Sequence, residues 1–153
     1  VMIYHLMGLL IIVPFIAIAF AVERFGGGAQ LLENTHLVRG ADAIVVSNHG
    51  GRQVDGSISA LDALGPVADA VGHEVDILMD SGIRCGADVI KALALGADAV
   101  LYGRPWVYGL GLAGADGVRH ALRSLLADLD LTMGLAGLAS VAEIDRSILM
   151  SNS

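Results

Sequence analysis

From residue 43 onward the chain repeats one pattern: a short apolar run, a helical segment, and another apolar run. The apolar runs are residues 43–46, 75–79 and 99–102, and each has the length and composition of a buried strand. Residues 60–71 and 88–94, which lie between the runs, have helical composition. This alternation is typical of βαβ units, in which helices cover a parallel sheet. The pattern therefore predicts an α/β fold.

Two of these strands are preceded by the same tripeptide, Gly-Ala-Asp, at residues 40–42 and 96–98. Reuse of a helix, turn and strand unit is typical of the (β/α)8 barrel, whose active-site residues lie in the loops after the strands. Such a barrel takes ~250 residues, so a chain of 153 residues predicts only part of one. Two more helices are expected downstream, over residues 117–129 and, shorter, over 141–149.

The N-terminal segment has a different character. Residues 1–22 contain no Lys, Arg, Asp or Glu, and residues 9–20 are almost wholly apolar. A helix of ~20 apolar residues can span a bilayer and tolerates an internal proline such as Pro14. The alternative, equally favoured, is a buried or misplaced apolar segment. A cleavable signal peptide fits less well, because no basic residues precede the apolar run.

The charge and cysteine content exclude some classes of partner and site. A net charge of -7 predicts no basic patch for nucleic acid, which is not expected as a partner. Cys85 is the only cysteine, so neither an intrachain disulfide nor a cysteine cluster for a structural metal is expected. This cysteine usage favours a cytoplasmic location, with membrane association through residues 1–22 as the other alternative.

A polar cluster, Ser-Asn-His-Gly-Gly-Arg-Gln at residues 47–53, directly follows the first strand. The strand would deliver His49 to the mouth of the barrel, where an imidazole can take up a proton near neutral pH. Arg52 can grip a carboxylate with two parallel hydrogen bonds, and the two glycines would let a flat ligand approach the backbone. A base beside a carboxylate clamp suits a small hydroxy acid. Alternatively, both side chains satisfy loop carbonyls and carboxylates such as Asp55.

Two further clusters, residues 80–86 and 103–105, follow the next two strands and combine glycines with Arg84 and Arg104. Exposed backbone N–H groups, the positive end of a following helix and two arginines are the components of a phosphate site. Each cluster alone could be an ordinary helix-capping turn. Because barrels commonly bind phosphate between the loops after strands seven and eight, the pair predicts that these are the last two strands.

The clusters together resemble the FMN-dependent 2-hydroxy-acid dehydrogenase family, which includes glycolate oxidase, lactate oxidase, lactate 2-monooxygenase and mandelate dehydrogenase. The resemblance covers about residues 37–149, and residues 53–58 are most similar to lactate 2-monooxygenase-like members. It implies the C-terminal part of a TIM barrel over residues 37–150, preceded at residues 1–36 by an apolar leader, expected to be helical, and a Gly-rich join. The implied cofactor is FMN, the substrate a small 2-hydroxy acid, and the complete enzyme a homo-oligomer.

The resemblance also implies a role for each site residue. His49 would remove a proton from the substrate while two electrons pass to the flavin, Arg52 would bind the substrate carboxylate, and Asp80 would hydrogen-bond the ribityl chain. Ser81 stands where many members have a second glycine, and its backbone N–H would still be available. The residues that correspond to the phosphate contacts are Gly82, Arg84, Gly103 and Arg104.

Upstream of residue 37 the sequence departs from the family pattern. Its flavin-contacting loops, a tyrosine near the substrate, a lysine that faces the flavin and an aspartate that orients the histidine have no counterpart here. We therefore expect this chain alone not to reach a family-like rate. One alternative is another phosphate-binding barrel such as inosine-monophosphate dehydrogenase, which lacks the His-Gly-Gly-Arg run. The other is a non-catalytic, membrane-tethered remnant that keeps an FMN-phosphate pocket.

Overall fold

The computed structural model describes residues 41–150, so the predicted apolar helix and the Gly-rich join lie outside the described residues. Three strands form a parallel sheet in the order β1-β2-β3. Strand β1 spans Ala43–Val46, β2 spans Asp76–Met79 and β3 spans Ala99–Val100. In the register of the sheet, Val46 pairs with Met79, and Met79 pairs with Val100. The predicted α/β arrangement is confirmed for this part of the chain.

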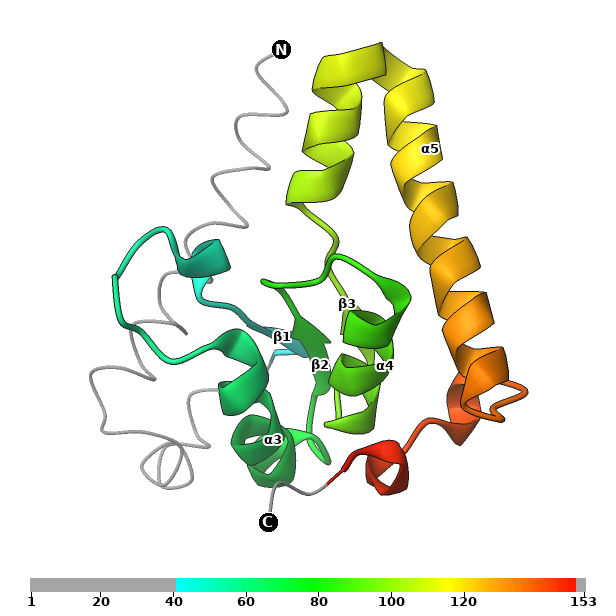
Figure 1. The fold of residues 1–153 in the computed structure, drawn as a ribbon. Helices are drawn as coiled ribbons and strands as arrows, with labels where there is room; N and C mark the ends of the chain where they lie inside the picture. The colour runs from blue at the N-terminus through cyan, green and yellow to red at the C-terminus, as the bar shows by residue number, and fades with distance from the viewer. Residues whose placement is uncertain (1–40, 151–153) are drawn as a thin grey trace.

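Helices α3 (Ala60–Val71) and α4 (Gly86–Ala94) pack against the sheet (Figure 1). Helix α3 has the predicted bounds and is capped by Ser59, whose hydroxyl accepts the N–H of Asp62 at 3.0 Å. The side chains that the sheet buries with these helices in one core are Ile44, Val46, Ile77 and Met79. The alternate strand residues Val45, Leu78 and Ala99 are partly or fully exposed. One face of the sheet therefore carries the core, and the other is only partly covered within residues 41–150.

The Gly-Ala-Asp tripeptide before β3 joins the end of α4 to the start of the strand. The N–H of Ala97 donates to the carbonyl of Ala92 at 3.1 Å, and Gly96 has the left-handed φ of +105° that such a helix end requires. Asp98 then exchanges two hydrogen bonds with Ile77, one through its N–H and one through its carboxylate, both at 2.7 Å. This copy of the tripeptide thus ends a helix and places β3 beside β2.

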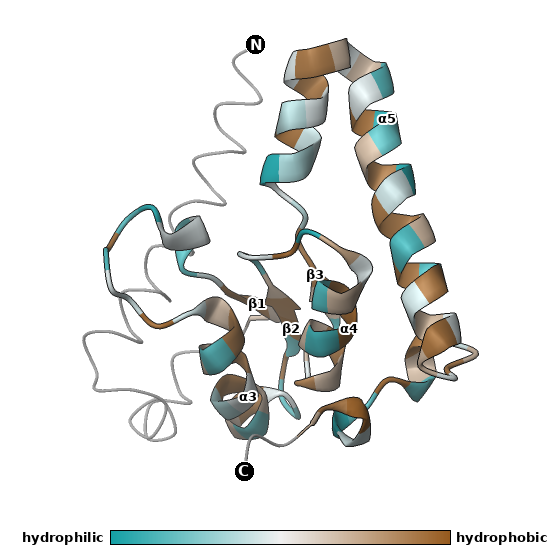
Figure 2. Ribbon diagram, in the orientation of Figure 1, coloured by the Kyte–Doolittle hydropathy of each residue, from teal (hydrophilic) through white to brown (hydrophobic). Residues whose placement is uncertain are grey.

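Helix α5 (Arg104–Leu135) is a hairpin of two helical arms, which reverses at Ala113 and Gly114 (Figure 1). The arms come closest at Gly109 and Gly117, where a Cβ on Gly117 would lie 1.9 Å from the Gly109 carbonyl oxygen. The helix predicted over residues 117–129 lies in the second arm. Gly117 is the only buried residue of α5, and several of its apolar side chains are exposed to solvent (Figure 2).

The prediction of a helix over residues 141–149 is wrong, because this segment forms two single 3-10 turns, η3 (Val141–Glu143) and η4 (Arg146–Ile148). Asp145 interrupts the helix by accepting the N–H and the hydroxyl of Ser147 with its own side chain. Ile144, between the turns, is extended.

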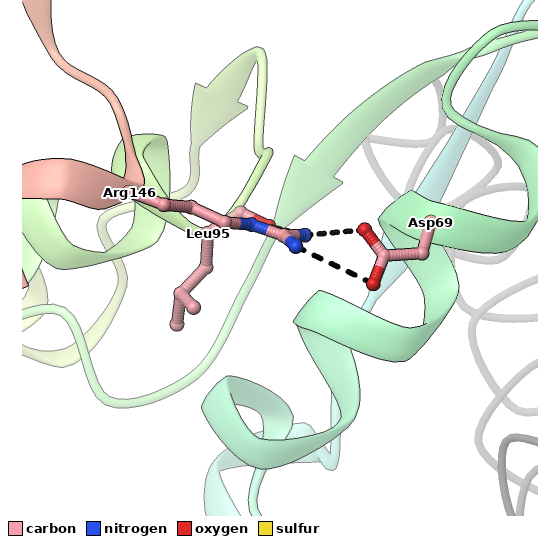
Figure 3. A network of polar contacts seen from close by, with 3 residues as sticks. All are labelled: Asp69, Leu95 and Arg146. Atoms are coloured by element: carbon pink, nitrogen blue, oxygen red, sulfur yellow. Dashed lines mark hydrogen bonds and ion pairs between the residues drawn. The ribbon is translucent and has the colours of Figure 1, made fainter. Parts of the chain in front are cut away.

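An ion pair fixes the second of these turns to the sheet-covering helices. Arg146 donates to both carboxylate oxygens of Asp69 in α3, at 2.5 and 3.4 Å, and to the carbonyl of Leu95 at the end of α4, at 3.5 Å (Figure 3). Both charged side chains are more than half exposed, so the pair is worth at most about 1 kcal/mol. Its main effect is to hold the C-terminal turn against α3 and α4.

We expect Gly86→Ala to lower the free energy of unfolding by about 1–3 kcal/mol or more, because it overpacks the contact between α4 and α5. The added Cβ would lie 2.4 Å from the backbone nitrogen of Leu129, and a backbone atom cannot swing away as a flexible side chain can. Gly134→Ala is the matched control: it also lies in a helix, but its Cβ would meet nothing within 4 Å. There we expect about 0.5–1 kcal/mol of stabilisation. Urea unfolding followed by circular dichroism checks both values, and equal effects would contradict the packing argument.

Candidate active site

A cleft of about 720 Å³ lies where the three strands end. Because parallel strands present their carboxyl ends at one edge of the sheet, the loops after β1, β2 and β3 meet there. Every site residue expected from the sequence lines this cleft: His49, Arg52, Asp80, Ser81, Gly82, Arg84, Gly103 and Arg104. The structure thus brings together residues that are up to 55 positions apart in the chain.

His49 stands at the start of a left-handed turn, η2 (His49–Gly51), with φ values of 56°, 66° and 72° along its three residues. A histidine in this region of φ is uncommon and needs support from its surroundings. Each N–H of the turn has an acceptor: Ser47 Oγ for His49 at 3.0 Å, Ser81 Oγ for Gly50 at 2.8 Å and Asn48 Oδ1 for Gly51 at 3.1 Å. These hydrogen bonds therefore fix the backbone of the turn, while the His49 and Arg52 side chains are exposed along the cleft.

The first glycine of this turn lies beside an arginine of the protein. Arg104, the first residue of α5, donates to the carbonyl of Gly50, and a Cβ on Gly50 would collide with its guanidinium group. Gly51 fits the original expectation better, since a Cβ there would meet nothing within 4 Å.

Asp80 is the centre of a small polar network beneath the cleft. One of its oxygens, Oδ2, accepts the hydroxyls of Ser47 at 2.6 Å and Ser81 at 3.1 Å. The two hydroxyl oxygens lie 3.2 Å apart. Within residues 41–150 the other carboxylate oxygen accepts no hydrogen bond, so Asp80, which lines the cleft, retains acceptor capacity. No role was expected for Ser47, although a buried polar residue directly at a strand end is a signal that could have identified it.

The two clusters expected to bind phosphate differ in how many backbone N–H donors they leave free for a ligand. Three donors at or just before the start of α4 already have acceptors: Arg84 N and Cys85 N donate to Asp88 Oδ2 at 3.0 and 3.2 Å, and Gly86 N donates to Asp128. These three N–H groups are therefore not free for a phosphate. No side chain caps the N-terminus of α5, which begins directly after Gly103.

Open space over two glycines marks where an anion fits best. A Cβ on Gly82 or on Gly103 would meet no atom within 4 Å, so the backbone is accessible from the cleft at both positions. The exposed Arg84 lines the same space. Tyr108, from the first arm of α5, also lines the cleft and was not expected from the sequence. Burial raises the pKa of Tyr102, which follows β3.

A family model described as FMN-dependent dehydrogenase matches residues 34–151. The chain belongs to this family. An FMN-dependent alpha-hydroxy acid dehydrogenase of Penicillium citrinum is 56% identical over 110 residues, which are 72% of this chain and 27% of that protein. An L-lactate oxidase of a Nostoc species is 52% identical over 110 residues, 72% of this chain and 30% of the oxidase. A crystal structure of mandelate oxidase with benzoyl-formic acid is 48% identical, with a TM-score of 0.70 over 75% of this chain and 35% of that one.

Membership of the FMN-dependent dehydrogenase family makes the chain part of an oxidoreductase family whose cofactor is FMN. The solved relatives are TIM barrels, and the three-stranded sheet corresponds to part of such a barrel. The chain spans only 27–30% of the length of these two sequence relatives. Within residues 41–150, none of the helices has both the length and the apolar composition that crossing a bilayer requires.

Proposed function

We propose that residues 37–150 form the C-terminal part of an FMN-dependent enzyme that oxidises a small 2-hydroxy acid, of the lactate, glycolate or mandelate type, to the 2-oxo acid. The observation that carries the proposal is the meeting of three loops in one cleft. There His49 and Arg52 lie on the same turn, and Asp80 and Arg84 lie on the neighbouring loop. A phosphate-binding barrel without the base and the clamp would account for only half of this arrangement.

His49 is the proposed catalytic base. Its backbone is fixed by three hydrogen-bonded N–H groups, while its imidazole is exposed to the cleft and free to accept a proton from a substrate. Arg52, three residues further on, is exposed on the same side and can bind a carboxylate in a bidentate manner. In a 2-hydroxy acid the carboxylate is attached to the carbon that carries the hydroxyl. A substrate of this kind therefore suits a base, His49, and a carboxylate-binding residue, Arg52, that are only three positions apart.

The residues present also fit FMN. The bound flavin would supply a two-electron acceptor, which no side chain of the cleft can provide. Asp80 would hold a ribityl hydroxyl through its free acceptor capacity. The phosphate would lie over Gly82 and Gly103, where the backbone is open, with Arg84 and the uncapped start of α5 supplying positive charge.

A comparison of FMN with riboflavin tests this placement of the phosphate. We expect the chain to bind FMN more tightly than riboflavin, and Arg84→Gln to weaken FMN binding by about tenfold, because a charged hydrogen bond to an anion contributes roughly 1.5–3 kcal/mol. Riboflavin binding should not change. The measurement is quenching of flavin fluorescence at low ionic strength.

Arg119→Gln is the control for general loss of positive charge, since Arg119 is exposed on the second arm of α5 and outside the cleft. It should leave both affinities unchanged. Equal affinity for FMN and riboflavin in the unsubstituted chain would refute the proposed phosphate site.

A further inference from the structure

The hydroxyl of Ser81 connects the loop after β2 to the turn that carries His49. It accepts the N–H of Gly50 at 2.8 Å and donates to Asp80 Oδ2 at 3.1 Å. A hydroxyl has one proton and two lone pairs, so it can make both bonds at once. The hydroxyl of Ser47 bonds in the same way to the preceding residue of the turn: it accepts the N–H of His49 and donates to Asp80 Oδ2. Two consecutive N–H groups of the turn are thus linked to one carboxylate through two hydroxyls.

Ser81 holds this place at a conformational cost. Its φ of 86° lies in the left-handed region, which glycine adopts freely and a residue with a Cβ does not. A side chain at such a position is strained, and strain of this kind is found where the surrounding structure enforces it for a function. Within the described residues the hydrogen-bonding contacts of the Ser81 hydroxyl are to Ser47, Gly50 and Asp80, so these contacts are what the serine adds over glycine.

We propose that Ser81 is a positioning residue for His49, which holds the left-handed turn under the proposed base and couples it to Asp80. The proposal rests on the proposed function, which makes His49 the base and Asp80 a flavin ligand. It predicts that the order of the turn depends on the Ser81 hydroxyl and not on the overall stability of the chain. Substitutions that change the order of the turn and the stability of the chain in opposite directions can therefore test it.

Ser81→Gly and Ser81→Thr are such substitutions. Glycine removes the hydroxyl but relieves the left-handed strain, so thermal stability should be equal or higher while the Gly50 amide exchanges with solvent about tenfold faster. Threonine keeps the hydroxyl but adds β-branching at a positive φ, so stability should fall while Gly50 stays protected. The measurement is hydrogen exchange of the 15N-labelled 153-residue chain by NMR, with thermal unfolding of each variant.

Two further variants complete the design. Ser81→Ala removes the hydroxyl and keeps the strain, so it should lose protection at Gly50 to the same extent as Ser81→Gly although its stability is lower. If the threonine variant folds poorly, this comparison of two hydroxyl-free variants that differ in stability still separates the hydroxyl from stability. Ser147→Ala removes a hydroxyl bonded to Asp145, outside the cleft, and should leave Gly50 unchanged. In Ser81→Gly we also expect the His49 imidazole resonances to broaden as the turn samples other arrangements.

The proposal would be overturned if protection of the Gly50 amide followed thermal stability across the variants. Protection would then be lower in Ser81→Thr and unchanged in Ser81→Gly, and Ser81 would have a structural role only. No flavin enters this experiment. Failure of the chain to bind FMN would therefore count against the proposed function, while the result at Gly50 would still decide the role of Ser81.

Discussion

Replacing His49 with glutamine should lower the rate of flavin reduction by a 2-hydroxy acid by about 10²-fold or more, with FMN still bound. Glutamine has similar size and hydrogen-bonding ability but cannot take up the proton. The turn around His49 is held through backbone N–H groups, so the substitution should leave the cleft intact. The suitable protein is a chimera in which residues 37–150 replace the corresponding segment of a full-length relative such as the Nostoc lactate oxidase.

The control for this experiment is His73→Gln, which changes an exposed histidine between α3 and β2, outside the cleft. It should leave the rate unchanged. Anaerobic stopped-flow absorbance of the flavin measures the reduction step directly, and flavin content per protein reports whether FMN is retained. A wild-type rate in the His49→Gln chimera would remove His49 from the role of base.

The strands and α3 could be predicted from the sequence because short apolar runs and a capped amphipathic segment are local signals. The first arm of α5 could not be predicted. It contains Gly109 and Gly111, which are poor helix formers, and it is stabilised instead by close contact of Gly109 with Gly117 in the second arm. The predicted helix over residues 141–149 failed for the opposite reason, since its apolar spacing is helical but Asp145 binds the local backbone.

The members of the cleft could also be predicted, because polar residues directly after parallel strands meet at one edge. Their bonding partners could not. The contact between Ser81 and Gly50 joins loops 31 residues apart, and the acceptor for Gly86 N, Asp128, lies 42 residues further along the chain. Only the packed structure shows that Gly86 N, at the start of α4, already has an acceptor. We therefore expect the phosphate over Gly82 and Gly103, where the backbone is open.

The second large effect concerns the 153-residue chain expressed by itself, which should reduce flavin with 2-hydroxy acids at a rate near background. In the described residues β1 and β3 each have a neighbour on one side only, and the face of the sheet that carries Val45 and Leu78 is only partly covered. A barrel needs every strand paired on both sides. Arg84 and the glycine loops would still hold a phosphate, but residues 41–150 provide no further strands to form a wall beside the isoalloxazine ring.

Without that wall the ring is not held beside His49, and positioning contributes roughly 7–11 kcal/mol to well-oriented reactions, so its loss suppresses turnover by orders of magnitude. The open strand edges and exposed leucines of α5, such as Leu112 at 88% exposure, also favour association of the chain with itself. The test is to mix the purified chain with FMN and excess L-lactate, glycolate or mandelate under anaerobic conditions and to follow bleaching of the flavin. Rapid bleaching that disappears in His49→Gln would contradict this prediction. It would show that this chain is catalytically sufficient, and a dependence of the rate on protein concentration would then test whether self-association supplies the wall.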